Sequence, residues 1–152
     1  MSYCAEIIES NFSMKAENFD KAYKVVCELN VHDNMKIGGK FGGEPTVKPA
    51  DSKSVSNNPD KWFSFMAWNY DEVCNDLIEV LKMLGFDMYL SDDGIDSIYF
   101  CDKVGQEDIF LDAIAPYVEP DSYLLWRGED DTMWVYVFED GKMIEKGAYI
   151  VW

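Results

Sequence analysis

The sequence predicts an α+β fold, with a mainly antiparallel sheet and two to three helices packed on one face. Three observations lead to this prediction. The chain is 48% apolar and 15% aromatic, which at 152 residues is enough to bury a core without staples. Two segments have a clear helical period, and several short segments rich in aromatic and β-branched residues lie between turn signals. We expect a single domain spanning residues 1–152.

The first two elements are a strand and a helix. Residues 3–9 predict a strand, and residues 16–30 then change to a helical period. In that helix one apolar stripe would consist of Phe19, Ala22, Tyr23, Val26 and Cys27.

A long segment without periodicity follows, at about 34–61. It is rich in Gly, Pro, Ser and Asn, and it leans basic, with five lysines against three acidic residues. Because so long a structureless stretch is unusual inside a compact domain, we expect a flexible loop that is either functional or an insertion. Residues 62–68, WFSFMAW, would restart ordered structure as a short strand or aromatic anchor.

Residues 69–85 predict the clearest helix. Asn69 and Glu72 have the spacing of a capping box, and Gly85 supplies a left-handed stop. The buried stripe of this helix would be Val73, Leu77, Val80, Leu81 and Leu84.

The remaining elements are mostly strands. Residues 86–90 and 95–101 predict a hairpin around SDDG, and residues 106–115 predict a short helix that Pro116 ends. Residues 123–126, 133–138 and 142–151 predict an antiparallel meander with turns at 129–131 and 140–141.

The net charge of −16 restricts the class of partner. Residues 62–152 alone hold 20 Asp and Glu against 5 Lys and Arg. Such a surface disfavours direct binding to nucleic acid, which depends on cationic side chains at the phosphates, and it equally disfavours anionic membranes. The charge favours a basic protein surface as partner.

The cysteines and the N-terminus indicate a cytoplasmic protein. Cys4, Cys27, Cys74 and Cys101 form no CxxC pair and lie in apolar contexts, so we expect reduced, structural thiols. The first residues lack the basic and long apolar regions of a signal peptide, and no segment has the roughly 20 apolar residues of a spanning helix.

No motif for cofactor binding or catalysis is complete. The cluster GGKFGG lacks the Lys-Ser/Thr pair of a phosphate loop, and Lys40 occupies the place of the second glycine in a dinucleotide fingerprint. His32 is the single histidine, with no sequence-level partner for nucleophilic catalysis. We therefore expect a protein that is not an enzyme, with no cofactor and no metal.

The acidic turns do not match an EF-hand. With Gly94 or Gly141 in the glycine position, the first ligand would be Tyr89 or Tyr136, which cannot bind calcium as required. An irregular cation site stays open as an alternative, but adjacent carboxylates in hairpin turns are more often solvated turn formers. The carboxylates in question are Asp92, Asp93 and Asp96 in one group and Glu129, Asp130 and Asp131 in another.

The aromatic strand 133–138 allows two interpretations. Trp134, Tyr136 and Phe138 share one face, and the other face is also apolar. The favoured interpretation is a central strand covered on both sides. The alternative is an exposed aromatic patch that includes Trp126 or Trp152 and is rimmed by carboxylates, which would be a protein-binding surface.

The stretch 110–145 contains a Ser-Tyr strand, a Gly-Glu-Asp turn, the aromatic strand and an Asp-Gly-Lys turn. It resembles small acidic proteins of unknown function from bacteria and their phages, and residues 5–26 are compatible with the start of such proteins. The resemblance implies a mobile-element context, in which inhibitors of host defence and toxin antidotes are common. It implies no catalytic residues.

These observations together predict a non-catalytic acidic protein that occupies a basic, nucleic-acid-binding surface of a nuclease or host defence protein, as an anti-CRISPR or similar inhibitor would. The alternatives are a toxin-neutralising immunity protein and a small enzyme with a carboxylate or metal site. The expected contact residues are the three aromatics of strand 133–138 with Trp126, and the acidic residues Asp92, Asp93, Asp96, Glu129, Asp130, Asp131, Glu139 and Asp140.

Overall fold

A computed structural model describes residues 3–39 and 42–148, and it has the predicted α+β architecture with antiparallel sheets. The larger sheet has five strands in the order β5-β1-β6-β7-β8. These strands are β1 (Cys4–Asn11), β5 (Cys101–Lys103), β6 (Tyr123–Gly128), β7 (Met133–Glu139) and β8 (Lys142–Ala148). The predicted meander is confirmed up to Ala148, and residues 149–151 of the predicted last strand lie outside the described residues.

A second sheet of three strands has the order β2-β4-β3, formed by β2 (Met14–Lys15), β4 (Gly94–Tyr99) and β3 (Asp87–Ser91). The predicted hairpin 86–101 is present, but its second strand changes sheets at Phe100. The ring of Phe100 is buried and its carbonyl accepts a hydrogen bond from the Ile7 N–H, so the chain turns there and continues as β5 beside β1.

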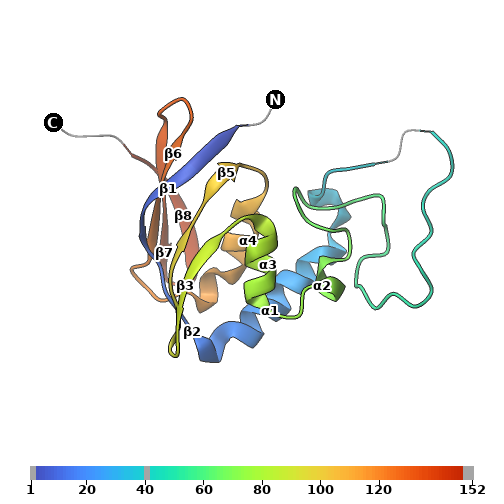
Figure 1. The fold of residues 1–152 in the computed structure, drawn as a ribbon, viewed down its shortest axis with the longest axis horizontal. Helices are drawn as coiled ribbons and strands as arrows, with labels where there is room; N and C mark the ends of the chain where they lie inside the picture. The colour runs from blue at the N-terminus through green and yellow to red at the C-terminus, as the bar shows by residue number, and fades with distance from the viewer. Residues whose placement is uncertain (1–2, 40–41, 149–152) are drawn as a thin grey trace.

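All the helices lie on one side of the five-stranded sheet (Figure 1). They are α1 (Phe19–Glu28), α2 (Tyr70–Val73), α3 (Leu77–Leu84) and α4 (Glu107–Ile114), with short 3-10 turns at Ala16–Asn18, Leu29–Val31, Asp33–Met35 and Ala115–Tyr117. Between the helices and the sheets lies one apolar core, in which the rings of Phe63, Tyr70 and Phe110 meet edge to face.

The predicted single helix 69–85 is wrong, because the chain breaks it after Val73. Asp76 caps a new helix, since its carboxylate accepts a hydrogen bond of 2.8 Å from the Glu79 N–H. Val73 is consequently 48% exposed instead of buried, whereas the other four residues of the predicted stripe are buried. The stop at Gly85 is confirmed, with φ +113.

The segment 34–61 extends away from the sheets, beyond α1 and α2 (Figure 1). In its described residues, 34–39 and 42–61, regular structure is limited to the 3-10 turn at its start and a bridge between Ile37 and Trp62. Its second half is nevertheless attached by specific hydrogen bonds. The carboxylate of Asp71 accepts from the Ser54 hydroxyl at 2.6 Å, from the Val55 N–H at 2.8 Å and from the Asn30 amide at 2.8 Å.

A buried lysine completes this attachment. The ammonium group of Lys36 is fully buried and donates to the Asn30 carbonyl at 2.7 Å, to Asp33 at 2.8 Å and to the Ser56 hydroxyl at 3.4 Å. It also lies 5.8 Å from the centre of the Phe63 ring. Lys36 thus links Ser56 to the Asn30 carbonyl, and together with the Asp71 bonds it holds residues 54–56 against the helical layer.

Candidate functional site

Two of the three predicted acidic clusters lie at the same end of the molecule. The turn between β3 and β4 contains Asp92 and Asp93, and the Asp93 carbonyl accepts a hydrogen bond of 2.9 Å from the Ala16 N–H. The turn between β7 and β8 contains Asp140, directly after Glu139 at the end of β7. Both turns lie at the end of the sheets where β1 passes into β2.

The linker before β6 joins these two turns. The Glu119 N–H donates to the Ser13 carbonyl at 2.9 Å, next to β2, and the Asp121 N–H donates to the Phe138 carbonyl at 3.2 Å, at the end of β7. The linker therefore adds two carboxylates between the clusters. We call the whole row the acidic edge, formed by Glu17, Asp92, Asp93, Asp96, Glu119, Asp121, Glu139 and Asp140.

Few cations lie within the acidic edge. Lys15 pairs with Glu119 at 3.7 Å, and Lys146 pairs with Glu139 at 4.0 Å. Lys142 of β8 lies opposite Glu139 of β7 in the strand register. Seven of the eight acidic residues are exposed, and Glu119 is partly exposed. Eight carboxylates against these three lysines leave the acidic edge with an excess of negative charge.

The third cluster, Glu129 to Asp131, lies at the opposite end of β7, as the sequence predicts. There the Tyr3 hydroxyl donates to the Asp130 carboxylate, which lowers the pKa of Asp130, and the Glu129 N–H donates to the Cys4 carbonyl at 2.9 Å. This turn is bound to the first strand, and Figure 1 shows it at the top, near the start of β1. It is not part of the acidic edge.

The four predicted aromatic contact residues do not form an exposed patch. Trp126 and Phe138 are buried, at 2% and 1% exposure, and Trp134 and Tyr136 pack partly buried against the core on the helix side. The Phe138 ring meets Phe12 edge to face at 5.4 Å. The aromatic face of β7 is therefore covered. For this face, the favoured interpretation of a covered strand is confirmed.

The opposite face of β7 is the less covered one. Met133, Val135 and Val137 are partly exposed there, and all the described helices lie on the other side of the sheet. The expectation that both faces are covered is thus correct only for the aromatic face.

Three of these aromatics line a pocket of about 150 Å³ between the start of α4 and the sheet. The indole rings of Trp126 and Trp134 stack with their centres 6.0 Å apart, and the indole N–H of Trp126 has no hydrogen-bond partner among the described residues. Burial raises the pKa of Tyr136, and so do the nearby charges of Asp108 and Glu145, while the Trp134 N–H beside its hydroxyl lowers it. The full lining is Val104, Gly105, Glu107, Asp108, Trp126, Trp134 and Tyr136.

Glu107 is the buried carboxylate of this pocket, at 2% exposure. Both of its oxygens accept from the Gly105 N–H, at 2.9 and 2.8 Å, and no cationic side chain pairs with it among the described residues. Burial is the main cause that raises the pKa of Glu107 above its ordinary value. An ionised Glu107 is therefore short of partners in the folded protein.

Replacing Glu107 by Gln is expected to stabilise the protein at neutral pH. Because the folded pKa is raised, the folded state binds the proton more tightly than the unfolded state, so stability falls as pH rises through the two pKa values. Glu107→Gln keeps an acceptor for the Gly105 N–H and removes the cost of burying an ionised carboxylate. We expect a Tm about 2–4 °C higher than wild type at pH 7.5, and a difference that disappears near pH 4.

Thermal denaturation followed by circular dichroism at several pH values would measure this difference. The matched control is Glu129→Gln, since Glu129 is exposed in a turn and should leave the pH profile unchanged. A Glu107→Gln difference that stays constant between pH 4 and pH 7.5 would contradict the assignment.

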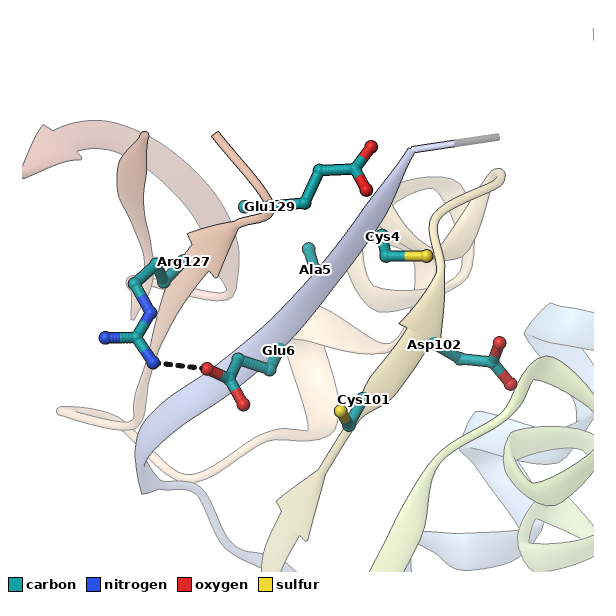
Figure 2. Close-up of a pocket in the computed structure, with 8 residues that line it drawn as sticks. Cys4, Ala5, Glu6, Cys101, Asp102, Arg127 and Glu129 are labelled. Atoms are coloured by element: carbon teal, nitrogen blue, oxygen red, sulfur yellow. Dashed lines mark hydrogen bonds and ion pairs between the residues drawn. The ribbon is translucent and has the colours of Figure 1, made fainter. Parts of the chain in front are cut away.

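A larger pocket of about 350 Å³ lies where β5, β1 and β6 run side by side (Figure 2). Arg127 and Glu6 point toward each other across it and form an ion pair of 2.5 Å. Cys4 and Cys101 lie on neighbouring strands, but the register places Cys101 opposite Glu6, so the two thiols are diagonal and poorly placed for a disulfide.

The burial of the thiols agrees with the expected apolar contexts at all positions except one. Cys74 is buried and Cys4 and Cys27 are half-buried, but Cys101 is exposed on β5. Burial raises the pKa of Cys27, and it raises that of Cys74 to about 11, which keeps both thiols protonated at neutral pH.

Within residues 3–39 and 42–148, no group of three or more His, Cys, Asp or Glu side chains could hold a metal ion. The carboxylates of the two cation sites that the sequence left open as an alternative are therefore not gathered as ligands in this part of the chain. In the same part of the chain, no helix has the length and apolar character needed to cross a membrane.

The chain matches no protein-family model, and searches of curated proteins and of solved structures find no match to it. The resemblance to small acidic proteins of bacteria and phages thus stays a prediction.

Sequence reasoning missed Glu107, Glu119 and Asp121. Glu107 opens a short helix as many exposed glutamates do, and only the packing of α4 onto the aromatic face buries it. Glu119 and Asp121 flank Pro120 in a linker whose position depends on its bonds to Ser13 and Phe138. The sequence holds no local signal for either arrangement.

Proposed function

We propose that this protein is a non-catalytic binding protein whose acidic edge contacts a basic surface of another protein. The observation that supports this most directly is the convergence of two acidic turns and the linker between them, from three distant parts of the sequence, on one end of the molecule. The proposed partner is a nuclease or another nucleic-acid-handling protein of a host defence system, met in the cytoplasm. The protein would act as its inhibitor.

The physical reason is that a row of exposed carboxylates can take the place of phosphates in a cationic groove. Such a row increases the rate of encounter with a positively charged surface and excludes acidic partners. The edge is built on turns and strand ends that backbone hydrogen bonds fix in place, so little entropy is lost when it binds.

A catalytic role has less support from the geometry. Glu107 has a raised pKa in a pocket, as a general acid often does. The other residues that line the pocket include no Ser, Thr, Cys, Lys or His, so none of these residue types is present to act as a nucleophile or general base beside Glu107. The pocket is better suited to holding a group than to reacting with it.

Neutralising the acidic edge is expected to weaken the complex by roughly 30-fold or more at low salt, because four interfacial charges are lost. The variant is Asp92→Asn, Asp93→Asn, Asp96→Asn and Asp140→Asn. The partner would first be captured from the native host, and its affinity for purified wild-type and variant protein would then be measured by calorimetry at about 50 and 300 mM salt.

The matched control removes the same number of charges elsewhere, through Glu28→Gln, Glu44→Gln, Asp87→Asn and Asp112→Asn, all at exposed positions. We expect the control to bind within about threefold of wild type. A complex equally tight at both salt concentrations, or weakened as much by the control as by the edge variant, would rule out the proposed function.

The toxin-neutralising alternative places recognition in the aromatic patch and the segment 34–61, and because the aromatics are covered, the segment is the part left to carry it. One observation favours it: Val47 is 85% exposed in a segment whose second half the Asp71 network holds in place. The same binding comparison separates the two functions, since the edge substitutions leave this segment intact.

A further inference from the structure

The pocket beneath α4 contains two buried polar groups that have fewer hydrogen-bond partners than such groups normally have in a protein interior. Glu107 is a buried carboxylate whose hydrogen-bond donors are backbone N–H groups, those of Gly105 and of Glu107 itself, and no cationic side chain pairs with it among the described residues. Trp126 is buried, and its indole N–H has no acceptor among the described residues. Since buried polar groups are normally hydrogen-bonded, these groups indicate that something outside the described chain completes the site.

The charge of the pocket selects the sign of that group. Asp108 is exposed and lines the pocket beside Glu107, and both Asp108 and Glu145 act on the Tyr136 hydroxyl through their charges. An anion would be repelled by these carboxylates. A cationic nitrogen would instead pair with them and lie against aromatic rings, whose faces attract cations.

The indole N–H of Trp126 adds a second requirement. A cation has no acceptor to offer this N–H, so the occupant must also present an oxygen. A basic residue within a peptide has both parts, because its side chain ends in an ammonium or guanidinium group and its backbone carries carbonyls. The volume of about 150 Å³ is enough for the end of one such side chain.

The surroundings of the pocket suit an inserted side chain. Phe65 has a φ of +68, which is unusual for a bulky residue, and its side chain is 53% exposed. Its ring packs against Gly105, which lines the pocket, so closely that a Cβ on Gly105 would lie 2.9 Å from it. Strained residues are concentrated at binding sites, and an exposed aromatic beside a pocket is typical of an interaction hot spot.

We propose that this pocket binds the side chain of one arginine or lysine from a protein partner. The cationic group pairs with Glu107 and Asp108 and contacts the rings of Trp134 and Tyr136, and a carbonyl of the same peptide accepts from the Trp126 indole N–H. This site lies apart from the acidic edge, under the start of α4, and it can be tested with no partner protein.

The test uses ¹H–¹⁵N spectra of the full chain, in which the indole N–H signals of Trp126 and Trp134 report directly on the pocket. The probes are N-acetyl-arginine-N-methylamide and N-acetyl-lysine-N-methylamide. The matched control ligand is the citrulline derivative, which has nearly the shape of the arginine probe without its charge. We expect saturable shifts of both signals with at least one basic probe, and binding about tenfold weaker or more with citrulline.

Glu107→Gln should weaken the basic probe by about tenfold, and Glu129→Gln at the far turn should leave its affinity unchanged. The dispersed spectrum of each variant shows that it is folded. Indole signals that do not move with any probe, equal binding of citrulline, or an unchanged affinity of folded Glu107→Gln would each overturn the proposal. Failure of this proposal would not affect the proposed function of the acidic edge, because the salt-dependent binding experiment changes different residues.

Discussion

Gly94→Ala is expected to lower the free energy of unfolding by about 3–5 kcal/mol and the Tm by about 10 °C. Gly94 has a φ of +140, and a Cβ at this position would lie 2.0 Å from the Met14 carbonyl oxygen and 2.7 Å from the Ala16 nitrogen. Both atoms belong to the backbone, so β2 would have to separate from β4 to make room. Urea denaturation of wild type and variant would measure the loss.

The control for this variant is Gly39→Ala. Gly39 has a similar φ of +136, but a Cβ there would meet no atom within 4 Å. Gly39→Ala should therefore lose only the free energy needed to place alanine at a positive φ, about 1 kcal/mol, without a steric clash. If the two variants lost equal stability, close packing of β2 against Gly94 would not be the reason that the position requires glycine.

Asp71→Ala is expected to cost about 3 kcal/mol and to release the second half of the segment 34–61. Its carboxylate is the common acceptor for Ser54, Val55 and Asn30, and the Ser54 and Asn30 side chains lie in the interior. Removing it leaves three donors without a partner, each at a cost of about 1–3 kcal/mol unless water reaches it. Hydrogen exchange of the amides of residues 52–56 should become markedly faster, and thermal denaturation gives the loss of stability.

Glu72→Ala is the matched control, because Glu72 is adjacent and also accepts from this segment, through Ser52 and the Lys53 N–H. Its carboxylate is exposed to solvent, so water can replace it and the effect should be much smaller than that of Asp71→Ala. Unchanged exchange in residues 52–56 of the Asp71 variant would show that other contacts hold the segment.

The fold class could be predicted from the sequence because periodicity is local, and α1, α4 and the meander all agree with it. The break within 69–85 illustrates the limit of such reasoning. Asn69 with Glu72 and Asp76 with Glu79 have the same spacing, so either pair could begin a helix. Capping by Asp76 determines where α3 begins, while Asn69 merely donates from its side chain to Glu72.

The site could be predicted only in part. The acidic turns follow from local turn chemistry and lie where the sequence places them along the strands. Their convergence depends on bonds between distant residues, such as Glu119 with Ser13. The side on which the helices pack determines which face of β7 is covered. Because both faces of this strand are apolar, its sequence does not indicate that side.

The position of β1 between β5 and β6 has a consequence for how the chain folds during synthesis. β1 pairs through Cys4 with Lys103 and through Ala5 with Gly128, so its two neighbours are made roughly a hundred residues after it. A ribosome must therefore release most of the chain before the first strand can find either partner. Until then the apolar residues of β1 have no sheet to join, and such a topology favours slow folding with a period of exposure to aggregation or to chaperones.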